Sequence, residues 1–119
     1  MKKKLVAVAA MMTAVAFAGE ALAFGAIAVD DEQGETDPGY GFVTGEDTKE
    51  EARAAALKAC RAQGNKNCKV VVWFETCGAY AASNKYYGYG FGKTKAVAVK
   101  KAVEMCGNKN CKPVVSECE

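Results

Sequence analysis

The pentapeptide Gly-Asn-Lys-Asn-Cys occurs twice in this chain, at Gly64–Cys68 and at Gly107–Cys111. Each copy follows an apolar run that ends in cysteine, and each precedes a run that contains valines. Glycine often ends a helix because it adopts the left-handed conformation without steric cost. The pentapeptide therefore predicts a turn between a helix and a strand, and its recurrence predicts that one structural unit is present twice.

The residues around the two pentapeptides align as copies of one unit. Thr48 stands 12 residues before Cys60, and Thr94 stands 12 residues before Cys106. Each unit reads strand, strand, helix, strand, and the two units cover about residues 24–77 and 78–118. We expect an α+β fold in which two pseudo-symmetric β-β-α-β units form one antiparallel sheet with two helices, stapled by disulfides.

Local patterns place the expected elements within each unit. Thr48 followed by Glu51 has the capping-box pattern that begins a helix. Thr94 is followed by Val97 at that place, so the second cap is expected to be weaker. The patterns predict, in the two units in turn, first strands at 25–29 and 78–83, second strands at 40–44 and 87–91, and helices at 49–63 and 95–106.

Small apolar residues recur at helical spacing, which lets each helix lie close to a sheet. The β-branched and aromatic run Val70–Phe74 predicts a central buried strand, with Trp73 in the core. Pro113, at the matching place in the second unit, predicts a strand that starts later or lies nearer an edge. The expected helix faces are Ala52, Ala55, Ala56 and Ala59 in the first unit, and Ala96, Val99, Val103 and Cys106 in the second.

The N-terminal stretch has the order of a secretory signal peptide. Three lysines follow Met1, an apolar run covers Leu5–Ala18, and Ala21 and Ala23 form an A-x-A cleavage site. We expect residues 1–23 to be removed and residues 24–119 to form a single exported domain, periplasmic or secreted. An uncleaved anchor is the alternative, but the run is shorter than the roughly 20 residues of a membrane helix. No membrane association is expected after cleavage.

Charge is distributed unevenly along the expected mature chain. Residues 1–23 contain three of the 16 basic and one of the 14 acidic residues, so the expected mature chain has no net charge. Residues 24–59 carry nine acids and three bases, and residues 60–119 carry four acids and ten bases. The halves either attract each other on folding or steer a partner. Without net positive charge or an arginine cluster, nucleic acid is not an expected partner.

All six cysteines lie in the expected mature chain, where they allow 15 pairings. The chain has no histidine and no Cys-x-x-Cys motif, so neither a zinc site nor a thioredoxin-like redox site is expected. We expect no metal and no cofactor. The equivalence of the two units, rather than spacing alone, predicts three structural bridges: Cys60–Cys68, Cys106–Cys111 and Cys77–Cys118.

Two stretches are candidates for function. The acidic stretch 30–39 reads as a solvated loop, with a weak calcium site or a catalytic carboxylate pair as alternatives. In 86–92, alternate residues of a strand would form an aromatic stripe, with glycines on the other face. The stripe either fills the core or offers a surface to a protein or a sugar. The candidate partner-binding residues are Tyr86, Tyr87, Tyr89, Phe91, Tyr40, Asp30, Asp31 and Glu32, and Phe42 would extend the stripe from the first unit.

Several of these stretches together resemble a known family. They are Gly25–Ala28, the alanine-rich run that ends in Cys60, the segment Cys68–Trp73, and Cys77–Ala81 with the Tyr-Gly run that follows. They resemble the exported bacterial proteins of domain-of-unknown-function family 4189, over nearly all of residues 24–119. The resemblance implies a small, exported, cysteine-containing domain and supplies no catalytic residues. The acidic stretch 30–37 is longer than the usual first loop of that family.

These features favour a non-enzymatic protein-interaction module with an unknown protein partner. The lack of histidine removes the usual general base and the usual nucleophile pairs, so no catalytic residue is expected. An inhibitor of a cell-wall or host hydrolase is an alternative, because a stapled, rigid domain binds at low entropic cost. A small glycan-active enzyme that uses carboxylates is a further alternative.

Overall fold

The computed structural model describes residues 23–31 and 38–119. The expected leader, apart from Ala23, and the candidate residue Glu32 lie outside the described residues. No helix of the described part is long and apolar enough to cross a membrane. The elements in chain order are β1 (Phe24–Asp30), β2 (Gly39–Glu46), α2 (Lys49–Ala62), β3 (Lys69–Phe74), β4 (Cys77–Ala82), β5 (Tyr87–Gly92), α3 (Lys95–Cys106) and β6 (Lys112–Cys118).

The order of these elements confirms the two β-β-α-β units, but the strands form two sheets rather than one. The first unit builds an antiparallel sheet of order β2-β1-β3, and the second builds one of order β5-β4-β6. The central strands are β1 and β4. The prediction that Val70–Phe74 forms a central strand was wrong, because β3 lies at a sheet edge. The edge position expected from Pro113 is confirmed in β6.

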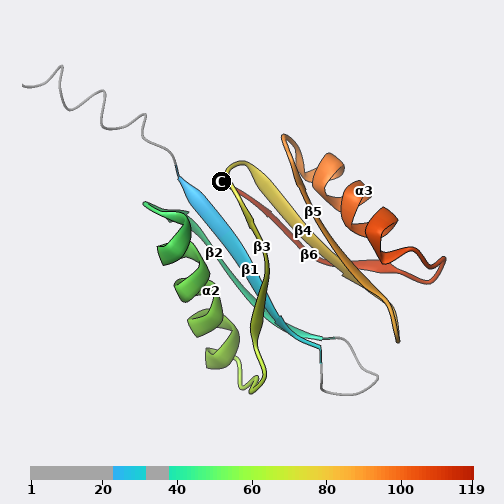
Figure 1. Cartoon of the computed structure of the whole chain (residues 1–119), viewed down its shortest axis with the longest axis horizontal. Helices are drawn as coiled ribbons and strands as arrows, with labels where there is room; N and C mark the ends of the chain where they lie inside the picture. The colour runs from blue at the N-terminus through green and yellow to red at the C-terminus, as the bar shows by residue number, and fades with distance from the viewer. Residues whose placement is uncertain (1–22, 32–37) are drawn as a thin grey trace, which may run out of the picture.

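The two sheets pack face to face, and each is covered on its outer face by its own helix (Figure 1). In β1, Ala26 and Ala28 face α2, while Ile27 and Val29 face the other sheet. In β4, Ala79 and Ala81 face α3, while Tyr80 joins the core between the sheets. Small residues thus let the helices approach, and large residues fill the space between the sheets. The result is a stack of helix, sheet, sheet and helix.

The helices pack by the residues that recur every four positions. Ala52, Ala56 and Cys60 are buried in α2, and Ala98, Ala102 and Cys106 are buried in α3. The predicted face of the first helix is therefore largely confirmed. The predicted face of the second helix is confirmed for Cys106 and in part for Val99 and Val103, which pack against the same cluster, but it was wrong for Ala96, which is exposed. The hydroxyls of Thr48 and Thr94 accept hydrogen bonds from the amides of Glu51 and Val97, so both threonines cap their helices.

The disulfides confirm all three predicted pairings. Cys60–Cys68 and Cys106–Cys111 each tie a helix to the strand that follows it, and Cys77–Cys118 joins β4 to β6. No cysteine is free. Gly64 and Gly107 both have positive φ, at 94° and 73°, which confirms the left-handed turn predicted after each helix.

Candidate functional site

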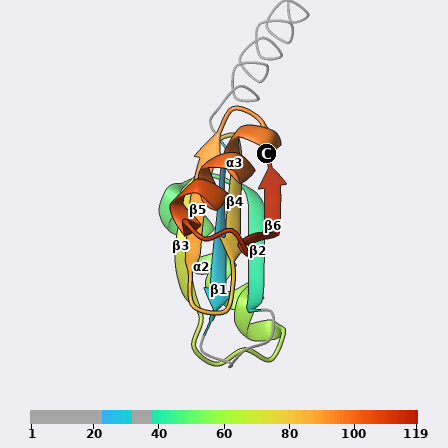
Figure 2. The same ribbon diagram turned by 90° about the vertical axis from the view of Figure 1, so that its right-hand side faces the viewer.

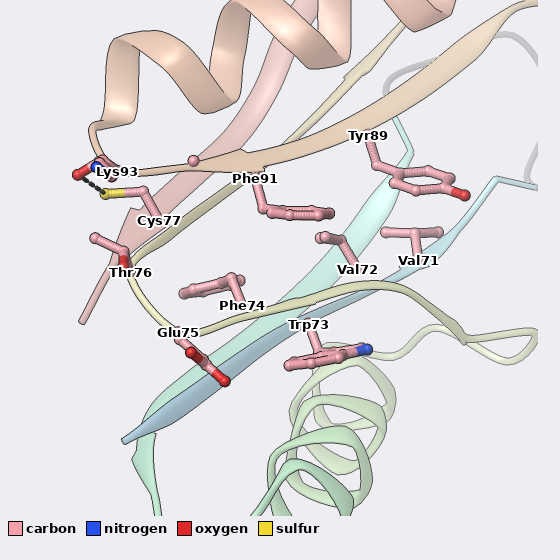
Figure 3. Close-up of a pocket in the computed structure, with 11 residues that line it drawn as sticks. Val71, Val72, Trp73, Phe74, Glu75, Thr76, Cys77, Tyr89, Phe91 and Lys93 are labelled. Atoms are coloured by element: carbon pink, nitrogen blue, oxygen red, sulfur yellow. Dashed lines mark hydrogen bonds between the residues drawn. The ribbon is translucent and has the colours of Figure 1, made fainter. Parts of the chain in front are cut away.

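Edge strands β3 and β5 lie side by side on one flank of the stacked sheets, and β2 and β6 lie on the other (Figure 2). A partly open groove of about 560 Å³ runs between β3 and β5. Figure 3 shows aromatic rings of β5 directed from one wall toward the aliphatic and aromatic side chains of β3. The residues that line the groove are Val71, Val72, Trp73, Phe74, Glu75, Thr76, Cys77, Tyr89, Phe91, Gly92 and Lys93.

The wall formed by β5 follows from the alternation in its sequence. Its glycines face α3, where a Cβ atom on Gly90 would lie 2.6 Å from the carbonyl oxygen of Ala98. A side chain on that face would push the helix away, so the bulk of the strand lies on the opposite face. There Tyr87, Tyr89 and Phe91 form the predicted stripe, and Phe91 is 58% exposed. The stripe is thus a surface feature rather than core filling.

The wall formed by β3 combines one buried ring and one exposed ring. Phe74 is buried between the sheets, and a Cβ atom on Gly25 or Gly78 would collide with its ring. Trp73 points to the other side of the strand, against Phe24, and is 37% exposed. The prediction that Trp73 belongs to the core was therefore wrong. A tryptophan on an edge strand keeps one side of its ring in solvent.

Lysine side chains surround the aromatic surface. The ammonium of Lys49 lies 4.7 Å from the ring centroid of Trp73, and that of Lys101 lies 5.7 Å from the centroid of Phe91. Lys69 lies 5.5 Å from the ring centroid of Tyr87 and 3.5 Å from a carboxylate oxygen of Asp31. Cations over aromatic faces are favourable and leave positive charge at the rim of the groove. Lys93 adds a further cation to its lining.

The remaining candidate residues do not converge on one place. Tyr86 is half exposed in the turn between β4 and β5, and Asp31 is held by Lys69 beside Tyr87, at the start of β5. Tyr40 lies with Phe42 on β2, at the opposite flank, so the prediction that they extend the aromatic stripe was wrong. The stacked sheets place β5 beside β3 and β2 beside β6, so the equivalent strands β2 and β5 lie on opposite flanks.

Asp30 is buried at the end of β1. The prediction that Asp30 lies in a solvated loop and contacts a partner was wrong, because Asp30 ends β1 and is 1% exposed. One of its carboxylate oxygens accepts hydrogen bonds from the amides of Lys66 and Asn67, at 3.1 and 3.0 Å. Asp30 therefore holds the first pentapeptide turn and is not available to a partner.

Ionisable side chains are sparse in the lining of the groove. Within the described residues, Glu75 is the one carboxylate that lines it. No group of three or more histidine, cysteine, aspartate or glutamate side chains in that part of the chain is placed to hold a metal ion. The groove is instead suited to apolar contact with a charged rim.

Comparison with known proteins places the chain in a family. Residues 24–118 match the family described as a domain of unknown function, DUF4189. The chain belongs to this family. Over 60 residues it is 42% identical to Protein Rv1269c of Mycobacterium tuberculosis and to Protein Mb1300c of Mycobacterium bovis, which covers 50% of this chain and 46% of each relative. The chain spans about half the length of these curated relatives, and no solved structure matches it.

The internal repeat of this DUF4189 domain allows its two flanks to be compared position by position. The strand registers make Phe42 equivalent to Tyr89, and Trp73 and Phe74 equivalent to Ser116 and Glu117. The two flanks therefore differ at one strand: β6 carries Ser116 and Glu117 where β3 carries Trp73 and Phe74, whereas β2 keeps exposed rings where β5 has them. A hydrogen bond also joins β2 to the residue after β6, because the Glu119 carboxylate accepts from the Gly45 amide at 2.7 Å. The aromatic groove belongs to one flank and is not a consequence of the repeat itself.

Proposed function

We propose that this protein is an exported, non-enzymatic interaction module that binds a protein partner in the groove between β3 and β5. The observation that carries the proposal is the difference between the two flanks. Two copies of one unit present equivalent flanks, yet rings stand on both strands of the β3–β5 flank and only on β2 in the other. Exposed aromatic residues around a concave surface are typical of the centres of protein interfaces.

The disulfides support the location and the mode of binding. Structural disulfides persist in oxidising compartments, which agrees with export. Cys60–Cys68 also fixes the β3 edge of the groove to α2, and the lining residue Cys77 is bonded to Cys118, so little entropy is lost when a partner binds. The lining with a single carboxylate among the described residues supports binding over glycoside hydrolysis, which uses a carboxylate pair.

Photo-crosslinking tests this proposal. A photoreactive phenylalanine analogue replaces Phe91 in one sample and Phe42, the exposed ring of the opposite flank, in another. The oxidised protein is mixed with envelope and culture-medium fractions of the source bacterium and irradiated. We expect one stoichiometric protein adduct at position 91 and none at position 42. A captured hydrolase whose activity falls on binding would favour the inhibitor function. Equal labelling at both positions, or no adduct at position 91, would refute the proposal.

A further inference from the structure

The open edge of β5 is covered by side chains rather than by another strand. Among the described strands, β5 pairs with β4 alone. The backbone amide of Tyr89 does not point at β4 but donates to the thioether sulfur of Met105, with 3.3 Å between nitrogen and sulfur. A thioether is a weak acceptor compared with a carbonyl oxygen. The edge therefore holds a backbone donor that a better acceptor would satisfy more strongly.

Residues two positions apart on a strand direct their amides to the same edge, so those of Tyr87 and Phe91 point the same way as that of Tyr89. These donors are spaced as an added antiparallel or parallel strand requires. Met105 is 52% exposed, so its side chain is free to move off the edge when such a strand arrives. The cap is thus one that a ligand can displace.

Both faces of a strand added to this edge would meet suitable partners. On the groove side it would lie beside the rings of Tyr87, Tyr89 and Phe91. On the helix side it would meet Val97, Lys101 and Met105, which recur every four residues along α3 and are exposed. Because side chains of a strand alternate between its faces, one set would cover the rings and the other would lie along this helical row.

The lysines around the groove favour an added strand with acidic side chains. Lys101 lies over the ring of Phe91, and Lys93 lines the groove at the end of β5. Lys69 lies over Tyr87, with Asp31 as its partner. Against these three lysines stand two carboxylates, that of Asp31 on Lys69 and that of Glu75 in the lining, so positive charge is in excess among these groups. An incoming segment with acidic side chains would meet complementary charge, and a basic one would be repelled.

We propose that the groove binds an extended acidic polypeptide segment, which adds as a strand to the open edge of β5 and displaces Met105. This inference rests on the proposed function and specifies its partner. Main-chain hydrogen bonds would supply affinity, and the rings and lysines would supply specificity.

Selection from a random dodecapeptide display library against the oxidised full chain provides the probe. We expect enriched peptides in which acidic residues alternate with apolar ones, and we expect proline at their centre to abolish binding. Binding of a synthetic enriched peptide should fall about tenfold in Lys101→Glu, because the reversal replaces an attraction by a repulsion. Lys100→Glu makes the same charge change on the neighbouring exposed residue of α3 and should alter binding less than about twofold.

Met105→Ala separates strand addition from simple contact with the groove. The variant removes the competing acceptor, so the enriched peptide should bind about threefold more tightly, with Glu104→Ala as the unchanged control. The amide of Tyr89 should also gain protection from hydrogen exchange when the peptide binds. Unchanged exchange at Tyr89 would overturn the strand geometry.

Two further results would overturn the inference. One is a library that yields no binders or yields binders without excess acidic residues. The other is binding of soluble polygalacturonate with the same dependence on Lys101 in the absence of peptide binders, which would make the ligand an anionic polysaccharide. If crosslinking at position 91 succeeds while these tests fail, the interaction function stands and the strand mode alone is wrong.

Discussion

The two copies of the pentapeptide are identical in sequence but make different turns. In the first unit, α2 continues two residues beyond Cys60, and the disulfide spans 8 residues. In the second unit, α3 ends at Cys106 itself, Gly107 follows at once, and the disulfide spans 5 residues. The distance from the helix cysteine to the glycine therefore decides which turn the same five residues adopt.

The two turns also depend on different parts of the chain. The first is held from a distance by Asp30, and the side-chain amide of Asn65 donates to the carbonyl oxygen of Cys60 at 2.8 Å. The second is local, since the side-chain oxygen of Asn108 accepts from the amide of Asn110 at 2.8 Å. Ser83, which directly follows β4, is the equivalent of Asp30 at the end of β1. Repetition thus preserved the topology but not the contacts, and variants should damage the two units unequally.

The largest difference is expected from the bridge that joins β4 to β6. Cys77 has Phe24 as its equivalent in the first unit, where a ring contact with Trp73 replaces the bond. Cys77→Ala with Cys118→Ala opens a loop of 41 residues and should lower the free energy of unfolding by about 4 kcal/mol. The bond between Cys106 and Cys111 closes a short loop, so replacing both cysteines should lower the free energy of unfolding by only about 2 kcal/mol. Urea unfolding measures both, and equal losses would contradict the chain-entropy account.

Asp30 provides the next largest effect. Asp30→Ala removes a buried charged acceptor from two turn amides and should lower the free energy of unfolding by about 3 kcal/mol. Ser83→Ala, at the equivalent position of the second unit, should change it by less than about 0.5 kcal/mol. Chemical denaturation of the oxidised protein measures the pair. A loss in Ser83→Ala as large as that in Asp30→Ala would show that the two turns are held alike after all.

The sequence predicts best what depends on near neighbours. The helix ends, the caps at Thr48 and Thr94 and the two local disulfides depend on residues close in sequence, and the equivalence of the two units supplied the pairing of Cys77 with Cys118. The separation into two sheets was not predicted, because it depends on which strand of each unit is central. A central strand here is one that is apolar on both faces. The signal is present in β1 and β4, where alanines alternate with Ile27, Val29 and Tyr80. The valine-rich sequence of β3 led to the wrong choice of central strand, since β-branched residues suit an edge strand as well as a central one.

The site was predicted in part for the same reason. The alternation in 87–92 predicts an aromatic face, and the structure places it at the surface. The opposite wall could not be predicted, because β3 comes from the other unit and meets β5 only when the sheets stack. Gly25 and Gly78 carried a usable signal. A glycine at the same place in both central strands indicates that a large side chain, here Phe74, packs across them.

A smaller difference is expected between equivalent positions of β2 and β5. Gly90 pairs with Ala79, and Val43 pairs with Ala26 at the matching place in the first unit. Gly90→Ala forces α3 away from its sheet and should lower the free energy of unfolding by about 2 kcal/mol. Val43→Ala shortens a half-buried side chain and should cost about 1 kcal/mol. Thermal unfolding followed by circular dichroism compares them, and a neutral Gly90→Ala would mean that the helix can shift without loss.

The smallest effect should have the opposite sign. Tyr80 and Ile27 are equivalent and fully buried between the sheets, but the Tyr80 hydroxyl has no hydrogen-bond partner among the described residues. Tyr80→Phe should therefore raise the free energy of unfolding at pH 7 by about 1 kcal/mol. Burial, with smaller contributions from Asp31 and Tyr87, raises the pKa of Tyr80 above its ordinary value.

The raised pKa adds a pH dependence that distinguishes the two units at this position. The unfolded chain loses the Tyr80 proton near pH 10, before the folded chain does, so stability is complete below that pH and is lost as the pH rises above it. The loss should approach about 1.4 kcal/mol per pH unit, and Tyr80→Phe should remove it. Tyr86→Phe, which changes an exposed hydroxyl, should retain it. Urea unfolding between pH 8 and about pH 11 measures the slope. A Tyr80→Phe variant less stable than the parent at pH 7 would show that the hydroxyl is satisfied, and that the core of the second unit depends on it.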